Sequence, residues 1–196
     1  MLQTLEDHTI ITGPPKSGKS WLALQLALEL SAENKLMFCG YHTDIFRLKE
    51  RVDALADNPD VDFPINFDCV FILQKPNHAS TFEAVLNEKV EDTIAELGKM
   101  DILVVDGVSD VQRLGVTNEQ MIRIFDTLAS KYGFKLLLVL QDFEIEEFMS
   151  ADVGGAWASN TVISIKDAST TVESSTGLKL DRTFDSPLWR ENDTVS

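Results

Sequence analysis

The residues with the clearest chemical potential lie in the stretch GPPKSGKS, from Gly13 to Ser20. This stretch fits the pattern G-x-x-x-x-G-K-[ST] without a mismatch. It stands between an apolar run, His8–Thr12, and a leucine-rich helical pattern, Gly18–Ser31. The glycines let the backbone turn so that N–H groups point inward, and the helix N-terminus adds the positive end of its dipole. The sequence therefore predicts a loop that holds the phosphate groups of a nucleotide.

Each side chain of this loop has an expected role. Lys19 would reach the β- and γ-phosphates, and the Ser20 hydroxyl would bind Mg²⁺. The two prolines stiffen the approach to the loop, and Lys16 adds charge near the γ-phosphate. A dinucleotide-binding fold is excluded, because G-x-G-x-x-G is absent. The predicted nucleotide-binding residues are Gly13, Pro14, Pro15, Lys16, Ser17, Gly18, Lys19, Ser20 and Trp21.

A second motif, MDILVVDG, supplies a carboxylate at the end of an apolar run. Asp106 stands where it would hold Mg²⁺ through the water shell of the ion, together with Ser20. A carboxylate at a strand end is common, so the prediction depends on the presence of the Gly13–Ser20 loop. The expected ligands are ATP and Mg²⁺.

The elements that must position these residues alternate between short apolar runs and longer amphipathic runs. Several of the apolar runs are hydrophobic on both faces, as in a parallel sheet covered on both sides by helices. This alternation predicts a doubly wound α/β fold with a mainly parallel sheet. The expected strands are His8–Thr12, Lys35–Gly40, Cys69–Gln74, Asp101–Asp106 and Phe134–Gln141. The expected helices are Gly18–Ser31, Thr43–Ala56, Ser80–Leu97 and Thr117–Tyr132.

The pattern changes near residue 161, where threonine- and valine-rich runs follow one another. We expect Thr161–Lys166, Thr170–Ser174 and Leu178–Phe184 to form an antiparallel meander at one edge of the sheet. Residues 1–188 are predicted to form one domain, and residues 189–196 a flexible tail.

The order of these motifs resembles the core of RecA-like P-loop ATPases, especially the DnaB-type helicase branch and related ATPases of mobile elements. The resemblance covers about residues 8–188. It implies that Gln141, at the tip of the LLLVLQ strand, senses the γ-phosphate, whereas the alternative is a polar strand end facing solvent. It also implies that Arg182 reaches ATP on a neighbouring subunit as an arginine finger. Leu180 replaces the lysine that DnaB-like proteins carry two residues before it, so an ordinary edge-strand charge is the alternative.

The resemblance fails after the second strand, where such ATPases carry a glutamate that polarises the attacking water. The sequence here is FCGYHTDIF, and the expected position falls on Tyr41 or His42. His42 and Asp44 are the candidates for a non-standard base, although Asp44 or Thr43 would also serve as a helix cap. Loss of the water-activating group typically costs about 10²–10⁴ in rate. The expected activity is therefore ATP hydrolysis that is slow, or ATP binding alone.

The two loops that touch nucleic acid in this family also differ. The first, GVSDVQRLGVTNEQ, contains a single arginine, Arg113, and the second begins with the acidic sequence DFEIEEFMSAD. Such a segment would repel a phosphate backbone. The nearby aromatics Phe143, Phe148 and Trp157 fit a protein contact or core packing at least as well as base stacking.

The composition gives the wider setting. There are 32 acidic and 17 basic residues, a formal charge of −15, which disfavours non-specific nucleic-acid binding. No apolar run approaches the roughly 20 residues of a membrane helix, and the N-terminal sequence lacks the layout of a signal peptide. Cys39 and Cys69 lack metal-ligand spacing and are expected to be buried thiols in a reducing compartment. A cytoplasmic protein without a membrane partner is expected.

Three functions follow. The first is a RecA/DnaB-type ATPase that forms a homo-oligomer and acts in DNA replication, recombination or plasmid maintenance. The second is an ATP-binding switch that acts on a protein partner and hydrolyses ATP poorly. The third is a small-molecule kinase, which the absence of an arginine-rich lid disfavours. The first is favoured through the resemblance, and fold alone does not fix function.

Overall fold

The computed structural model describes residues 8–41, 45–56, 70–72, 79–141, 146, 161–166 and 169–174. Its strands are β1 (Thr9–Gly13), β2 (Leu36–Gly40), β3 (Val70–Ile72), β4 (Ile102–Asp106), β5 (Lys135–Gln141), β6 (Thr161–Lys166) and β7 (Ser169–Ser174). Its helices are α1 (Lys19–Leu30), α2 (Ile45–Ala56), α3 (Ala79–Leu97), α4 (Val108–Gln112) and α5 (Asn118–Tyr132). The nine elements predicted upstream of residue 142 are present, with ends that differ by one to two residues in most cases.

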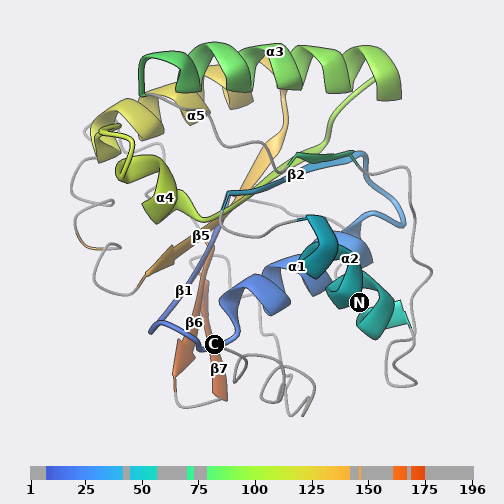
Figure 1. Ribbon diagram of the computed structural model, residues 1–196, viewed down its shortest axis with the longest axis vertical. Coiled ribbons are helices and arrows are strands. Elements are labelled where there is room, and N and C mark those ends of the chain that lie inside the picture. The colour runs from blue at the N-terminus through green and yellow to red at the C-terminus, as the bar shows by residue number, and fades with distance from the viewer. Residues whose placement is uncertain are drawn as a thin grey trace.

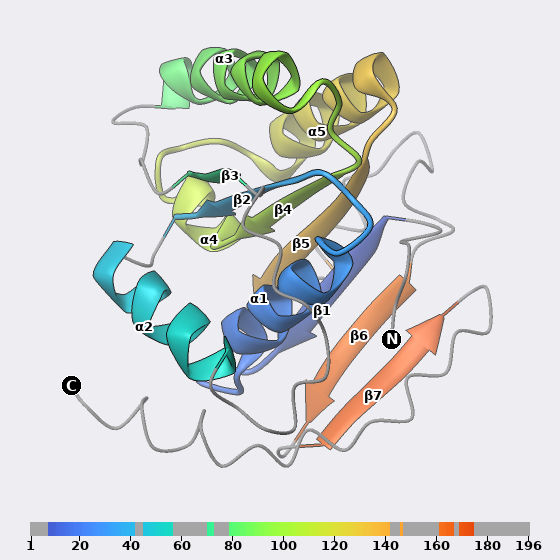
Figure 2. The ribbon, with the colours of Figure 1, turned by 90° about the vertical axis from the view of Figure 1, so that its right-hand side faces the viewer.

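The strands form a single seven-stranded sheet in the order β3-β2-β4-β5-β1-β6-β7. Neighbouring strands are parallel throughout, except for the antiparallel pair β6–β7. Figure 2 shows β1 inside the sheet, between β5 and β6, with β7 beyond β6. The mainly parallel sheet predicted from the apolar runs is confirmed.

The predicted three-stranded C-terminal meander is not seen among the described residues, which contain two of its strands. Strand β6 runs parallel to β1, with Thr9 opposite Thr161, so it continues the parallel sheet. Only β6 and β7 form an antiparallel pair among the residues that the structure describes. The third predicted strand, Leu178–Phe184, lies outside the described residues, as does the expected tail. Alternating short strands predict an antiparallel hairpin well, but they do not tell which strand of the main sheet pairs with it.

Helices cover both faces of the sheet. Figures 1 and 2 show α1 and α2 on one face and α3 and α5 on the other. Successive residues of β4 divide between two buried clusters: Leu103 and Val105 belong to the one beneath α3 and α5, and Ile102 and Val104 to the one beneath α1 and α2. Because side chains alternate along a strand, apolar residues at every position are needed to fill both layers.

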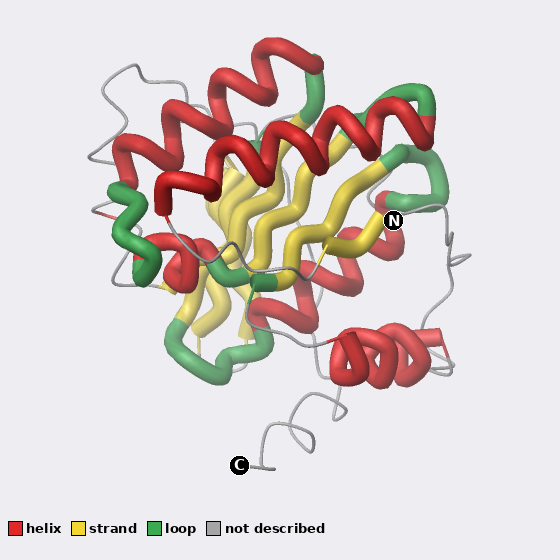
Figure 3. The backbone as a smooth tube through the Cα atoms, turned by 45° about the horizontal axis from the view of Figure 1, so that its top comes forward, coloured by secondary structure: helices red, strands yellow, loops and turns green. Residues whose placement is uncertain are grey.

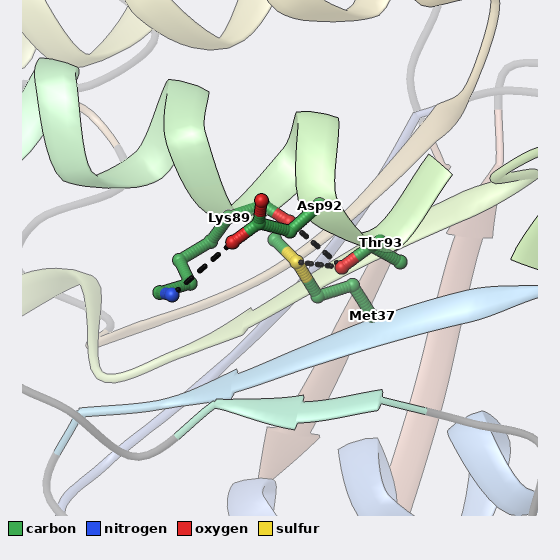
Figure 4. A network of polar contacts seen from close by, with 4 residues as sticks. All are labelled: Met37, Lys89, Asp92 and Thr93. Atoms are coloured by element: carbon green, nitrogen blue, oxygen red, sulfur yellow. Dashed lines mark hydrogen bonds and ion pairs between the residues drawn. The ribbon is translucent and has the colours of Figure 1, made fainter. Parts of the chain in front are cut away.

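One of the polar contacts of α3 reaches the sheet. Figure 4 shows Thr93, on α3, donating a hydrogen bond from Oγ1 to the carbonyl of Lys89 at 2.8 Å and lying 3.3 Å from Sδ of Met37 on β2. Lys89 also pairs with Asp92 at 3.3 Å. A buried threonine is therefore satisfied by its own helix while its body packs on the sheet.

Helices α3 and α5 lie side by side over the sheet (Figure 3). At the end of α5, the Tyr132 hydroxyl donates to Glu91 of α3 at 2.7 Å, and Lys131 pairs with the same carboxylate at 3.2 Å. Helix α5 begins with a capping box, in which Thr117 and Gln120 satisfy each other's backbone N–H groups. The contacts with Glu91 join the end of α5 to α3, and the capping box fixes the start of α5. Among the described residues, no helix combines the length and the apolar character that crossing a membrane requires.

Candidate functional site

The Gly13–Ser20 loop joins the end of β1 to the start of α1. Gly18 precedes the helix with φ 90° and ψ 10°, a left-handed conformation that glycine adopts without steric cost. The N-cap residue of α1 is Gly18, which has no side chain with which to cap the helix. The first turn of an α-helix has N–H groups without an intrahelical partner, and these groups bind anions well. The loop therefore presents an uncapped helix N-terminus at the end of β1.

Lys19 lies at the centre of this loop. Its Nζ atom donates hydrogen bonds to the carbonyl oxygens of Gly13 and Pro14, at 2.8 and 2.7 Å, and to Oε1 of Gln141 at 3.2 Å. The side chain is buried, with 7% of its surface exposed. A buried ammonium group needs compensating acceptors, and the loop backbone and β5 supply them. The positive charge is thus held within the turn.

Asp106 brings a carboxylate to the same end of the sheet. It is the last residue of β4 and is 1% exposed, and its Oδ1 accepts a hydrogen bond from Ser20 Oγ at 3.0 Å. Ser20 lies in the first turn of α1, so this bond joins the loop to β4. The predicted pair for Mg²⁺ is brought together. No group of three or more His, Cys, Asp and Glu side chains in the described part of the chain is placed to hold a metal ion.

Gln141 completes the arrangement. The register of β1 and β5 places Gly13 opposite Gln141, at the ends of two neighbouring parallel strands. The carboxyl ends of parallel strands lie at one edge of the sheet, which is where α/β proteins bind ligands. The alternative in which Gln141 is a strand end facing solvent does not fit, because its side chain contacts Lys19.

The loop is packed too tightly for a larger residue at its first glycine. A Cβ atom on Gly13 would lie 2.7 Å from Ser17 Oγ and 2.9 Å from the carbonyl oxygen of Ile165 on β6. Ser17 Oγ is itself buried, and it has no hydrogen-bond partner among the described residues. Buried hydroxyl groups are normally paired, so this one is a donor for which the loop itself provides no acceptor.

No protein-family model matches this sequence, and no curated protein matches it either. Solved structures do match. A KaiC-like protein from the hyperthermophilic archaeon Pyrococcus horikoshii OT3 aligns with a TM-score of 0.57 and 12% identity, covering 86% of this chain and 78% of that one. The RadB recombinase aligns with a TM-score of 0.52 and 16% identity, covering 86% and 80%. The fold is RecA-like. At these identities the likeness shows the fold alone.

Within this RecA-like fold, the end of β2 differs from the ends of β1, β4 and β5. Tyr41, one of the two positions where a water-polarising glutamate was expected, is 5% exposed and packs its ring 6.1 Å from that of Phe82. The other position, His42, lies outside the described residues. Its backbone N–H donates to the carbonyl of Asp106 at 2.9 Å. Its hydroxyl is hydrogen-bonded to the thiol of Cys39, and burial raises the pKa of that thiol to about 12 and the pKa of Tyr41 well above its ordinary value. Tyr41 is therefore a core residue.

Three other predicted catalytic residues lie outside the part of the chain that the structure describes. His42 and Asp44 lie outside the described residues, so their roles stay predictions. Arg182 and the neighbouring Lys179 also lie outside them, as do Cys69, Phe143, Phe148 and Trp157.

The first of the two expected nucleic-acid loops is folded into local structure. It forms α4 and a turn in which Leu114 and Gly115 donate backbone hydrogen bonds to Val111 and Gln112. Val108, Val111 and Val116 are buried against the sheet, and Arg113 is exposed. The sequence analysis did not predict α4, since five residues carry too little periodicity. Of the acidic second loop, the structure describes only Glu146, an exposed helical residue.

Trp21 is placed in the core between α1 and α2. It is 7% exposed, and the guanidinium carbon of Arg51, on α2, lies 5.5 Å from the centre of its ring. Sequence analysis missed Arg51, because nothing in an amphipathic helix marks one arginine as the partner of a tryptophan on another helix. The predicted contact of Trp21 with nucleotide stays a prediction.

Proposed function

We propose that this protein binds Mg²⁺-ATP in the Gly13–Ser20 loop and hydrolyses it slowly. The observation that carries the proposal is the convergence of Lys19, Ser20, Asp106 and Gln141 at one edge of the sheet. These side chains come from α1, β4 and β5, and two hydrogen-bonded pairs link them. A lysine, a hydroxyl and a carboxylate beside an uncapped helix N-terminus form a set of groups suited to a triphosphate and its metal ion.

The loop fits such a ligand on two further grounds. A Cβ on Gly13 would clash with Ser17 and Ile165, so the close-packed turn requires glycine at that position. The buried Ser17 hydroxyl has no acceptor among the described residues, and a phosphate oxygen would provide one. Bound Mg²⁺ would neutralise charge on the phosphates, and Ser20 and Asp106 are the residues that would hold it.

Lys19 and Gln141 have linked roles in this proposal. Lys19 would exchange backbone carbonyl acceptors for phosphate oxygens, which accept stronger, charge-assisted hydrogen bonds. Gln141 accepts from Lys19 at 3.2 Å, so movement of the ammonium group would free its side chain. Gln141 is then available to contact the γ-phosphate or the attacking water, as expected from its position at the tip of β5.

Slow hydrolysis follows from the end of β2. Tyr41 is buried and bonded to Cys39, so the water-activating group must come from elsewhere. We assign this role to His42 or Asp44, and the trans-acting charge to Arg182 of a neighbouring copy in a homo-oligomer. If neither His42 nor Asp44 activates the water molecule, the rate is expected to be lower by about 10²–10⁴.

The test is ATP turnover by the purified protein, with and without single-stranded DNA, beside Lys19→Ala as the blank. Turnover that Lys19→Ala abolishes supports the proposal, and stimulation by DNA supports a link to replication, recombination or plasmid maintenance. Turnover equal in wild type and Lys19→Ala contradicts the assignment of the site.

A second candidate is an ATP-dependent switch that acts on a protein partner. The burial of Tyr41 favours it, as does the folding of the Gly107–Gln120 segment into α4 and a capped turn, which leaves one exposed arginine there. This candidate predicts tight ATP binding, turnover near the background of Lys19→Ala, and no effect of DNA.

A further inference from the structure

One contact between helices α1 and α2 has no role in the proposed phosphate site. Trp21, in the first turn of α1, is buried, and Arg51 of α2 places its guanidinium over the indole ring. Apolar packing surrounds this contact, since Leu48 and Leu55 of α2 belong to the same buried cluster as Trp21. A guanidinium over an indole face is attracted by the ring quadrupole, and more strongly where water is excluded.

The indole is held in an unusual way. Its Nε1–H is buried and has no acceptor among the described residues. A buried indole normally donates this hydrogen bond, and the bond fixes the orientation of the ring. Among the described residues, its packing and the cation above it are what position the ring. Its position therefore depends on where α1 and α2 lie relative to each other.

Trp21 of this pair is adjacent in the sequence to Ser20, a residue of the proposed metal site. Trp21 follows Ser20, whose hydroxyl donates to Asp106. At its other end, Arg51 lies on a helix that begins directly after residues 42–44, the segment that contains His42 and Asp44. The Trp21–Arg51 pair thus links the start of α1 to the helix that follows the proposed catalytic segment.

We propose that Trp21 and Arg51 couple the phosphate loop to α2, so that nucleotide bound at the start of α1 fixes the position of α2. Ligand in the loop orders the first turn of α1 and with it the indole, and the stacked guanidinium transmits this order to α2. Both are positioning residues, because they act through Ser20 and through α2. The inference rests on the proposed binding of nucleotide in the Gly13–Ser20 loop.

The test is hydrogen exchange of the backbone amides, with and without Mg²⁺ and a non-hydrolysable ATP analogue. The quantity compared is the ratio of exchange rates without and with nucleotide, measured separately for residues 18–22 and for residues 46–56. In wild type we expect nucleotide to slow exchange in both segments, by roughly threefold or more in α2, the size of one partly exposed cation–π contact. In Arg51→Ala the loop should keep its protection while the α2 ratio falls to about one.

Matched variants separate coupling from simple packing. Lys49→Ala removes a positive charge from an exposed position on the same helix and should leave the α2 ratio as in wild type. Trp21→Phe and Arg51→Lys keep a ring and a cation, so in both the α2 ratio should lie between one and the wild-type value. In Trp21→Leu the α2 ratio should fall to about one. These conservative variants also keep the test valid if Arg51→Ala does not fold.

The outcomes distinguish the inference from the proposed function. No protection of residues 18–22 by nucleotide would contradict both. Protection of the loop with no change in α2 of wild type would overturn the coupling alone. If the contact were purely structural, its loss in Arg51→Ala would speed exchange of α2 both with and without nucleotide and leave the ratio unchanged. That result would also overturn the coupling.

Discussion

The strand ends at the carboxyl edge of the sheet fall into two regions with different content. Strands β1, β4 and β5 end in Gly13, Asp106 and Gln141, and their polar groups meet around Lys19 and Ser20. Strand β2 ends beside them, with Gly40 opposite Asp106, but continues into Tyr41, which is buried against Phe82 and Cys39. The first region has the groups that we propose hold a nucleotide, whereas in the second Tyr41 packs into the core.

Under the proposed function, this difference would make nucleotide binding and hydrolysis separable. Binding requires the loop, the lysine and a metal-side carboxylate, all of which the described residues contain. Fast hydrolysis also requires an oriented water molecule. The predictions below test whether the first region binds nucleotide and whether the end of β2 is structural.

The largest effect is expected from Lys19→Ala. Loss of the ammonium removes charge-assisted hydrogen bonds to phosphate, and the affinity for ATP should fall roughly 10–100-fold. Isothermal titration calorimetry measures this change. Lys99→Ala, which removes an exposed lysine paired with Asp101, is the matched control and should leave affinity unchanged. Equal affinity of wild type and Lys19→Ala for ATP would contradict the proposal that the first region binds nucleotide.

Asp106→Asn should act through the metal ion. The amide still accepts from Ser20 but has no charge, so the gain in affinity for ATP that Mg²⁺ provides should shrink by about tenfold. Titrations with and without Mg²⁺ measure this gain in wild type and variant. A gain that survives the substitution would show that Asp106 does not contribute to the metal site.

Gly13→Ala tests the packing of the loop. The added Cβ meets a backbone carbonyl at 2.9 Å, which cannot move aside as a side chain can, so a loss of about 1–3 kcal/mol in the free energy of unfolding is expected. Gly98→Ala is the control, because nothing lies within 4 Å of its added Cβ. Its positive φ of 78° still costs energy, of the order of 1 kcal/mol. Denaturant unfolding would contradict the account if Gly13→Ala were the milder variant.

Tyr41→Phe should change stability and leave function alone. Removal of the hydroxyl breaks the hydrogen bond to Cys39, at a cost of about 0.5–1.5 kcal/mol, while the ring still packs on Phe82. ATP affinity and turnover should match wild type. A fall in turnover without a change in stability would assign Tyr41 to catalysis and erase the contrast between the two regions.

The thiol of Cys39 gives the smallest and most local test. With a pKa of about 12, only about 10⁻⁴ of it is thiolate at pH 8, so a disulfide reagent should modify it far more slowly than a free cysteine. The contribution of the protonated thiol to the free energy of unfolding is complete below its ordinary pKa of 9.0. This contribution is lost as the pH rises toward 12. Ellman's assay in a Cys69→Ser background measures the rate. Rapid native-state labelling at pH 8 would contradict the burial.

Sequence alone predicted the elements and the loop because both are local. The apolar runs of β4 and β5 fill two cores, and the phosphate-loop pattern depends on eight consecutive residues. What it did not predict depends on tertiary structure. Strand β6 pairs in parallel with β1, and Tyr41 turns into the core although it adjoins the site. The contact of Trp21 with Arg51 joins two helices, and no spacing in the sequence indicates it.

The most direct test of the account is one titration of the purified protein with Mg²⁺-ATP, followed by measurement of the ADP formed during it. The account predicts saturable binding that Lys19→Ala weakens, with ADP produced slowly relative to the time needed to reach binding equilibrium. Absence of binding would contradict the assignment of the first region. Binding accompanied by fast turnover would contradict the proposal that hydrolysis is slow.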